Sequence, residues 1–226
     1  MKNTIIIVGS GKLANNMKTG LPDYLNGSQI DYWENINNYE INKLIIVHIG
    51  SGRQLPEVIE FCNKYKVPLI QGATGMDIKQ NNCDFIFIDA PNLSLLMLKF
   101  MYMLKEYGHF FKDYKISITE SHQDTKKTVA GTAIEIANSL GVNSNEIKSI
   151  RNQDEQLNIY GITKEFLSLH AFHNISIQDK GTNITFKTLV EGHDSYINGL
   201  SKIIKCIKNL DNKYYHILDL IEMKLL

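Results

Sequence analysis

The chain has 226 residues, 43% of them hydrophobic and 21% charged, and its 24 basic residues balance its 24 acidic ones. A formal net charge of zero gives no electrostatic support for general binding to nucleic acid or to a membrane surface. Three widely spaced cysteines without a C-x-x-C pair argue against a zinc site and a disulfide framework. The apolar run before Gly9 is too short for a signal peptide or a membrane span. We therefore expect a cytoplasmic protein.

The first ninety residues contain several short apolar runs and one helical pattern. The β-branched run Thr4 to Val8 is followed by similar runs at residues 44–47, 68–70 and 85–88. Continuous apolar runs are typical of parallel strands that are buried on both faces. Residues 55–65, between the second and third runs, carry apolar side chains at helical spacing. The order strand, helix, strand predicts an α/β fold with a doubly wound parallel sheet.

The pattern changes after residue 92. We expect a long apolar helix, an alternating strand, a helix that ends at a glycine, three closely spaced strands and a helical tail. In that order the elements are predicted at residues 93–107, 115–119, 132–140, 167–170, 174–178, 183–190 and from 199 onward, with a last short element at 214–220. The close spacing of the three strands predicts a mixed or antiparallel sheet.

A glycine-rich turn, Gly9-Ser10-Gly11, joins the first strand to the next helix. Such a turn lets backbone N–H groups approach a pyrophosphate, and the N-terminus of the helix favours the anion. The spacing departs from a full G-x-G-x-x-G, with Ala14 near the place of the third glycine. A plain tight turn is therefore the alternative.

An acidic residue at the end of the second strand binds ribose hydroxyls in folds of this kind. Asp31 and Glu34 are the candidates, and Glu34 suits the strand end better, although a solvated strand end explains both equally well. No Arg or Lys is adjacent to either acid in the sequence, which favours NADH over NADPH. A second glycine-rich loop at 72–75 follows the strand at 68–70, where ligands bind in open α/β sheets; a simple turn accounts for it as well.

Residues 120–133 read E-S-H-Q-D-T-K-K-T-V-A-G-T-A. His122 can donate a proton near neutral pH, and Lys126 lies four residues further on. Gly131 and Thr132 open a helix whose N–H groups, together with the Thr hydroxyl, form an anion site. A proton donor, an ammonium group and a helix N-terminus suit a small substrate that carries carboxylates. The alternative is a loop that merely holds charges, with Thr132 as a cap.

This segment resembles the signature E-x-H-H-x-x-K-x-D-x-P-S-G-T-A of the dihydrodipicolinate (4-hydroxy-tetrahydrodipicolinate) reductases of bacterial lysine biosynthesis. It is one residue shorter between the Lys and the Gly. Further segments resemble that family in the same order along nearly the whole chain: EVIEFCNKYKVPLIQGATG, DAPNLS, FHNISI, DSYINGL and YYHILDLI. Ordered coverage of this kind is more specific than any single motif.

The resemblance implies a homotetrameric reductase of a cyclic dicarboxylate that uses NADH or NADPH, and we expect no metal site. It implies a Rossmann-like domain of residues 1–92 and 200–226, and an α+β domain of residues 93–199 that binds substrate and forms the oligomer. His122 would be the general acid and Lys126 its partner, and substrate would contact Gln123, Lys126, Gly131 and Thr132. The residues expected to bind the cofactor, Glu34 among them from the strand argument, are Gly9, Gly11, Lys12, Leu13, Glu34, Gly72, Thr74 and Asn92.

The chain departs from the family pattern on the substrate side. Gln123 stands where the family has a second His, and Thr128 stands where it has an Asp. Val129-Ala130 replaces Pro-Ser, and an Arg of the family falls at His193. Each lost charge-assisted contact weighs about 1.5–3 kcal/mol. Two alternatives are therefore kept: a reductase of a different cyclic imine or enamine acid in a secondary pathway, and a non-catalytic nucleotide-binding homologue.

Overall fold

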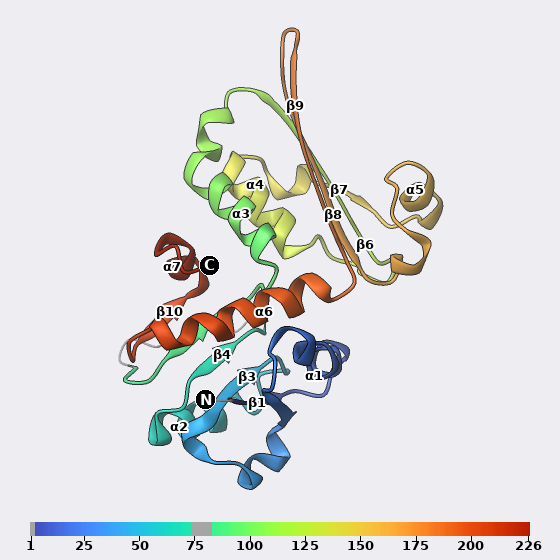
Figure 1. The fold of residues 1–226 in the computed structure, drawn as a ribbon. Helices are drawn as coiled ribbons and strands as arrows, with labels where there is room; N and C mark the ends of the chain where they lie inside the picture. The colour runs from blue at the N-terminus through green and yellow to red at the C-terminus, as the bar shows by residue number, and fades with distance from the viewer. Residues whose placement is uncertain (1–2, 74–82) are drawn as a thin grey trace. The chain divides into compact units, whose positions relative to one another are not determined.

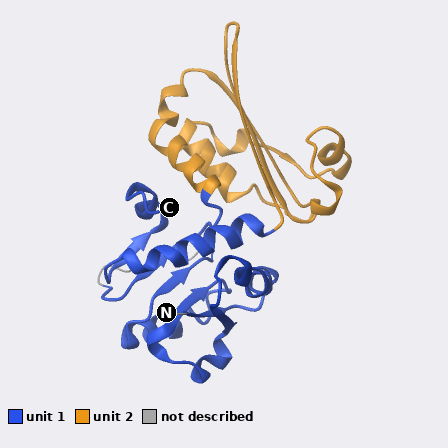
Figure 2. Cartoon of the chain, viewed as in Figure 1, with its two compact units in different colours: residues 1–95, 193–226 blue, residues 96–192 orange. Residues whose placement is uncertain are grey.

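A computed structural model describes residues 3–73 and 83–226 of the chain. The chain divides into two compact units, residues 1–95 with 193–226 and residues 96–192 (Figure 2). The second unit is therefore an insertion between two stretches of the first. Each unit has its own sheet.

The described residues of the first unit form a parallel sheet with the strand order β10-β5-β4-β3-β1-β2 (Figure 1). The strands are β1 (Thr4–Val8), β2 (Gln29–Tyr32), β3 (Leu44–His48), β4 (Leu69–Gln71), β5 (Phe87–Asp89) and β10 (Tyr214–His216). Both β1 and β3 are buried along their whole length, as continuous apolar runs predict. The predicted parallel α/β fold is confirmed.

Helices pack against this sheet and against one another. They are α1 (Lys12–Tyr24), α2 (Leu55–Tyr65), α6 (Asp194–Cys206) and α7 (Ile217–Glu222), with the 3-10 turns η1 (Trp33–Asn38), η2 (Ile41–Lys43) and η6 (Ile207–Asn209). Val58 and Cys62 of α2 belong to the buried core on one face of the sheet. At Gly199 of α6 an added Cβ would lie 1.8 Å from the carbonyl oxygen of Leu93. Only glycine allows an approach this close, so Gly199 lets α6 lie directly against the backbone at Leu93.

The second unit, all of which is described, has a mixed four-stranded sheet with the order β7-β6-β8-β9. Its strands are β6 (Lys115–His122), β7 (Lys148–Ile150), β8 (His170–Asp179) and β9 (Thr182–Glu191), and its helices are α3 (Leu95–Tyr107), α4 (Gly131–Leu140) and α5 (Gln153–Asn158), with η3 (Gly108–Phe111), η4 (Ser144–Glu146) and η5 (Lys164–Phe166). β7 runs parallel to β6, and the other pairs are antiparallel. Helices α3 and α4 cover one face, where Leu104 and Ile136 pack against Ile118 and Ile175. The predicted mixed sheet is confirmed.

Among the sequence-based boundaries that differ from the structure, three involve the starts of β8 and α6 and the end of β6. The strand predicted at 167–170 is a turn in which the Leu169 N–H donates to the Phe166 carbonyl, and β8 starts only at His170. β6 extends to His122, past the predicted end at residue 119, so the proposed proton donor lies on a strand. Helix α6 begins at Asp194 rather than residue 199, because its polar first turn hides the helical periodicity.

Candidate active site

The turn after β1 touches the backbone of a second turn at the carboxyl edge of the parallel sheet. Gly9 has a φ of +137°, and a Cβ there would lie 3.0 Å from the backbone nitrogen of Gly50. Only glycine combines this conformation with this close approach. Gly11 and Lys12, at the start of α1, are exposed, and Leu13 is half-buried. The N–H groups at this helix N-terminus are therefore accessible to an anion such as a pyrophosphate, so the predicted cofactor residues fit a dinucleotide.

The two predicted ribose-binding acids lie in different surroundings. Asp31 is inside β2, and its carboxylate accepts hydrogen bonds from Tyr39 Oη at 2.7 Å and from Asn35 Nδ2 at 3.1 Å. Lys18 Nζ lies 3.1 Å from the same carboxylate. The bond from Tyr39, with those from the backbone, Asn35 and Lys18, holds the pKa of Asp31 well below its usual range despite burial. Glu34, two residues past β2 in η1, is exposed and presents its carboxylate to solvent. Lys18 is a cation beside this strand that adjacency in sequence could not reveal.

Polar side chains lie in register at the carboxyl ends of β3, β4 and β5, namely His48, Gln71 and Asp89. Gln71 Nε2 donates to the carbonyl of Ala73 at 2.7 Å, which orients the amide. Gln71 Oε1 then accepts from the Ala73 N–H at 3.1 Å and lies 2.7 Å from His48 Nδ1, so Nδ1 of His48 carries the proton. Burial lowers the pKa of His48 and favours this neutral form. Together these bonds hold the start of the second glycine-rich loop.

The structure describes two of the three residues predicted near the nicotinamide. A Cβ on Gly72 would lie 2.9 Å from the Ile49 side chain, so the backbone approaches that side chain closely. Asn92 Oδ1 accepts a hydrogen bond from the Ser94 N–H at 2.9 Å. This bond fixes the side-chain amide, whose two N–H groups can act as donors. Thr74 lies outside the described residues.

In the second unit, a buried acid lies near the end of β6, on the same face as Ile118. The Glu120 side chain is fully buried and accepts a hydrogen bond from Ser149 Oγ at 2.5 Å. Arg151 donates to its two oxygens at 2.6 and 3.2 Å. Burial alone would raise the pKa of Glu120, but hydrogen bonds from His122, Arg151 and Ser149 outweigh burial and lower it to about 2. Glu120 is therefore an anion at neutral pH.

His122 is oriented by this anion. Its Nδ1 lies 2.7 Å from Glu120 Oε2, and its side chain is 14% exposed. Because an ionised carboxylate only accepts hydrogen bonds, Nδ1 must carry a proton. The other ring nitrogen, Nε2, is then the atom that can release or take up a proton. This arrangement suits a general acid whose orientation is set by an acidic neighbour.

Two further histidines on β8 were missed by the sequence reasoning. The His170 and His173 ring centroids lie 6.5 and 5.9 Å from that of His122. Burial lowers the pKa of both, that of His173 to about 4, so both are neutral at neutral pH. His173 Nδ1 lies 2.9 Å from Thr188 Oγ1, and Nε2 has no hydrogen-bond partner among the described residues. The spacing H-A-F-H was the available signal, but only the register with β6 places these rings beside His122.

The predicted substrate-binding residues follow β6 in one loop and the first turn of α4. The Lys126 N–H donates to the carbonyl of Gln123 at 3.0 Å, which forms a turn. Ala130 precedes the helix and has no polar side-chain atom, so the first N–H groups of α4 are open to another acceptor. Gly131 is exposed and Thr132 half-buried. The second unit thus contains His122, Gln123, Lys126, Gly131 and Thr132, whereas the described cofactor residues belong to the first unit.

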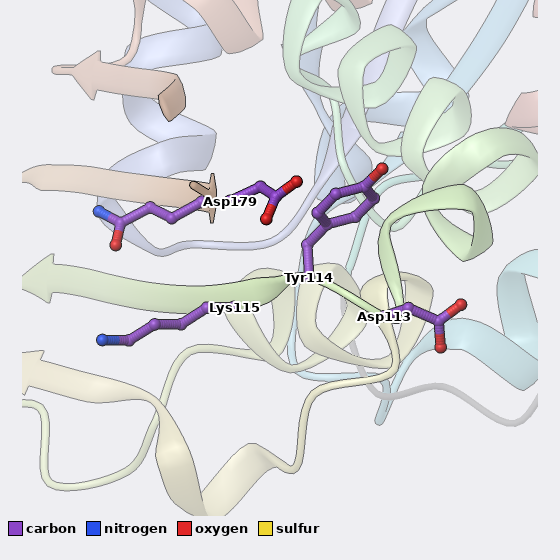
Figure 3. A pocket seen from close by; sticks show the side chains of 5 residues that line it. Asp113, Tyr114, Lys115 and Asp179 are labelled. Atoms are coloured by element: carbon purple, nitrogen blue, oxygen red, sulfur yellow. The ribbon is translucent and has the colours of Figure 1, made fainter. Parts of the chain in front are cut away.

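A shallow hollow of about 340 Å³ in the second unit lies away from this segment (Figure 3). It is lined by Asp113, Tyr114, Lys115, Gln178 and Asp179. Lys115 begins β6 and His122 ends it, so the two places are separated by the length of the strand. The hollow is therefore no part of the candidate active site.

Two further features are absent from residues 3–73 and 83–226. In that part of the chain no helix is long and apolar enough to cross a membrane. The same residues contain no group of three or more His, Cys, Asp or Glu side chains arranged to hold a metal ion.

Comparison with known proteins identifies the family. A family model described as dihydrodipicolinate reductase, C-terminus, matches residues 97–221, which is more than half of the chain. The chain belongs to the dihydrodipicolinate reductase family. This confirms the resemblance seen in the sequence motifs.

Relatives within the dihydrodipicolinate reductase family are distant. A rice protein described as probable 4-hydroxy-tetrahydrodipicolinate reductase 1, chloroplastic, is 30% identical over 152 residues, covering 60% of this chain and 44% of that protein. The 4-hydroxy-tetrahydrodipicolinate reductase of Campylobacter lari is 22% identical over 241 residues, covering 97% of this chain and 98% of that protein. The chain spans only 44% to 58% of the length of the plant relatives it matches.

A solved structure supports the fold. The dipicolinate-bound dihydrodipicolinate reductase from Paenisporosarcina sp. TG-14 superimposes with a TM-score of 0.70 over 98% of this chain and 100% of that chain, at 15% identity. At this identity the likeness shows the fold alone. It agrees with a Rossmann-like parallel sheet plus a second domain.

Proposed function

We propose that this protein reduces dihydrodipicolinate (4-hydroxy-tetrahydrodipicolinate) to tetrahydrodipicolinate with NADH or NADPH, in the biosynthesis of diaminopimelate and lysine. The observation that carries the proposal is the Glu120–His122 pair at the end of β6, followed by Lys126 and the open N-terminus of α4. Family membership and the printed names of the relatives support it. The dipicolinate bound to the Paenisporosarcina enzyme is a cyclic dicarboxylate, which is the class of compound that we propose as substrate.

The first unit would hold the dinucleotide. Gly9, Gly11, Lys12 and Leu13 would hold its pyrophosphate at the start of α1, since this turn exposes backbone donors. Further along the sheet, Glu34 would bind the ribose, and Gly72, Thr74 and Asn92 would line the nicotinamide. When bound, a reduced nicotinamide supplies the hydride.

The second unit would hold and protonate the substrate. Lys126 and the N–H groups of Gly131 and Thr132 would bind carboxylates, with Gln123 donating a further hydrogen bond. His122, doubly protonated, would release the Nε2 proton to the ring atom that gains electron density as the hydride arrives. The Nδ1–H of His122 stays hydrogen-bonded to Glu120, which stabilises both the imidazolium and the neutral ring.

The test is oxidation of NADH and NADPH, followed by the absorbance of the reduced nicotinamide, with freshly prepared dihydrodipicolinate. Wild type is compared with His122→Ala, Lys126→Ala and the matched control Lys127→Ala, since Lys127 is an exposed lysine next to Lys126. We expect turnover by wild type and by Lys127→Ala, and a loss of at least about a hundredfold in kcat/KM for the other two. A wild-type protein that binds cofactor and leaves this substrate unchanged would refute the proposal.

A specific observation favours a second candidate, a reductase of another cyclic imine or enamine acid. Gln123 and His193 stand where the family carries a His and an Arg, so the positive charge around the substrate differs. Turnover of such an acid without turnover of dihydrodipicolinate would establish this alternative. Cofactor binding without any reduction, and a cellular role that survives His122→Ala, would point instead to a non-catalytic homologue.

The oligomeric state is part of the same proposal. We propose a homotetramer built on the sheet of the second unit, in which β9 is an edge strand with Ile184 and Leu189 both exposed. Exposed apolar residues on an edge strand favour contact with another chain. Light scattering coupled to size-exclusion chromatography measures the mass directly, and a monomer would refute this part of the proposal.

A further inference from the structure

Arg151 directly follows β7 and uses all five of its N–H donors. Nη2 donates to Glu120 Oε1 at 2.6 Å, and Nη1 donates to Glu120 Oε2 at 3.2 Å. Nε donates to the carbonyl of Lys126 at 2.8 Å, and Nη2 donates to that of Thr128 at 3.2 Å. Nη1 also donates to the carbonyl of Ile150 at 2.9 Å, which anchors the guanidinium to its own strand. A planar guanidinium with five donors is thus fully satisfied.

These contacts reach two functionally different places. On one side, the guanidinium helps to keep Glu120 ionised, and Glu120 fixes the Nδ1–H form of His122. On the other side, it holds the carbonyls of Lys126 and Thr128, in the loop that leads from β6 to α4. The side chain of Arg151 touches neither His122 nor Thr132 in any of these bonds.

We infer that Arg151 is a positioning residue that couples the proton donor to the carboxylate-binding loop. One guanidinium sets the orientation and charge environment of His122 through Glu120, and the path of the backbone at Lys126. This inference rests on the proposed function of His122 and Lys126. It predicts that a single change at Arg151 alters both the pH dependence of turnover and the affinity for a cyclic dicarboxylate.

A lysine at this position would keep the charge and lose the geometry. An ammonium group has three donors on one atom and cannot reach the carboxylate and both loop carbonyls at once. Arg151→Lys therefore separates charge from positioning. Glu120→Gln removes the carboxylate charge that Arg151, Ser149 and His122 share, but Arg151 keeps its donors to the carbonyls of Lys126 and Thr128.

The experiment measures the affinity for dipicolinate by calorimetry, the affinity for NADH or NADPH, and the pH profile of kcat, for wild type, Arg151→Lys, Glu120→Gln and the control Lys148→Ala. Lys148 is an exposed residue of β7. We expect Glu120→Gln to lower kcat and move its pH profile, with dipicolinate affinity within about twofold of wild type. We expect Arg151→Lys to move the pH profile and also to weaken dipicolinate binding about tenfold. The reason is that a displaced Lys126 would lose about one charge-assisted contact to a carboxylate of the ligand. Nicotinamide affinity stays unchanged in all variants.

A double-mutant cycle identifies the route. If Arg151 acts on affinity through Lys126, then Arg151→Lys weakens dipicolinate binding far less in a Lys126→Ala background than in wild type. Fully additive effects would overturn the inference, and so would an Arg151→Lys protein with wild-type affinity and pH profile.

If Arg151→Lys does not fold, the paired replacement Glu120→Gln with Arg151→Met removes both charges together and tests the same point. Wild-type dipicolinate affinity in that variant would overturn the inference. If wild type binds dipicolinate but the double-mutant cycle shows no coupling between Arg151 and Lys126, the inference alone is overturned. One that neither binds dipicolinate nor reduces dihydrodipicolinate overturns the proposed function as well.

Discussion

Replacing Glu120 by Gln should change how the stability of the protein depends on pH. In the folded chain the Glu120 carboxylate is fully buried and receives hydrogen bonds from His122, Ser149 and Arg151. These bonds lower its pKa from an ordinary value of 4.5 to about 2. A carboxyl group with a depressed pKa stabilises the folded state most when it is ionised, above the pKa of the unfolded chain. Glutamine is nearly isosteric and cannot ionise.

The magnitude follows from the two pKa values of Glu120. A difference of this size corresponds to about 3 kcal/mol of unfolding free energy at neutral pH, because each pKa unit is worth about 1.4 kcal/mol. The contribution is complete above the unfolded pKa and is lost as the pH falls through the folded pKa. By the same relation about 2 kcal/mol is left at a pH of about 3.5.

The assay is urea unfolding of wild type and Glu120→Gln at a series of pH values between neutral and about 3.5. Glu146→Gln is the control, since Glu146 is exposed and lies in the same unit. We expect Glu120→Gln to be less stable than wild type by about 3 kcal/mol at neutral pH, and the difference to shrink by about a third at the acidic end. The control should follow wild type throughout. A difference that stays constant with pH, or grows as the pH falls, would refute the reasoning that Glu120 is an ionised, hydrogen-bonded acid in the folded protein.

Three further predictions concern other parts of the molecule. Gly199→Ala places a Cβ 1.8 Å from the carbonyl oxygen of Leu93, so we expect a loss of about 3 kcal/mol in unfolding free energy. Thermal or urea unfolding measures this loss, and an unchanged midpoint would contradict the close approach. Gln71→Leu removes the bonds that hold Ala73, so nicotinamide binding, measured by quenching of intrinsic fluorescence, should weaken about tenfold while dipicolinate binding stays the same. Lys126→Ala should show the reverse pattern, with dipicolinate affinity about tenfold weaker and nicotinamide affinity unchanged; equal losses for both ligands would argue against a carboxylate-binding role.

Much of the fold could be predicted from local sequence. The run at Thr4–Val8 and the helix at Leu55–Tyr65 have the bounds that their patterns predicted. A strand buried on both faces leaves a continuous apolar run, and a helix with one buried face leaves a periodic one, so the pattern itself records the burial. The prediction failed at residues 167–170, where apolar residues occupy a turn that ends in a hydrogen bond from Leu169 to Phe166.

The candidate site also contains residues that the sequence could predict and residues that it could not. His122 and Lys126 stand in one short segment whose residue types suggest chemistry, so the sequence alone could single them out. Arg151 lies thirty-one residues from Glu120 and belongs to no motif. It reaches Glu120 because β7 pairs with β6 in the register that sets Ser149 opposite Glu120.

The sequence by itself therefore determined the parallel sheet, the family and the segment that carries the proposed proton donor. Only the tertiary structure decided which groups surround that donor, namely the guanidinium of Arg151, the buried carboxylate of Glu120 and the neutral ring of His173. The physical reason is that local burial patterns depend on neighbours along the chain, whereas protonation and orientation depend on strand register and on the path of a loop. Those are set by contacts between residues that are far apart in the sequence.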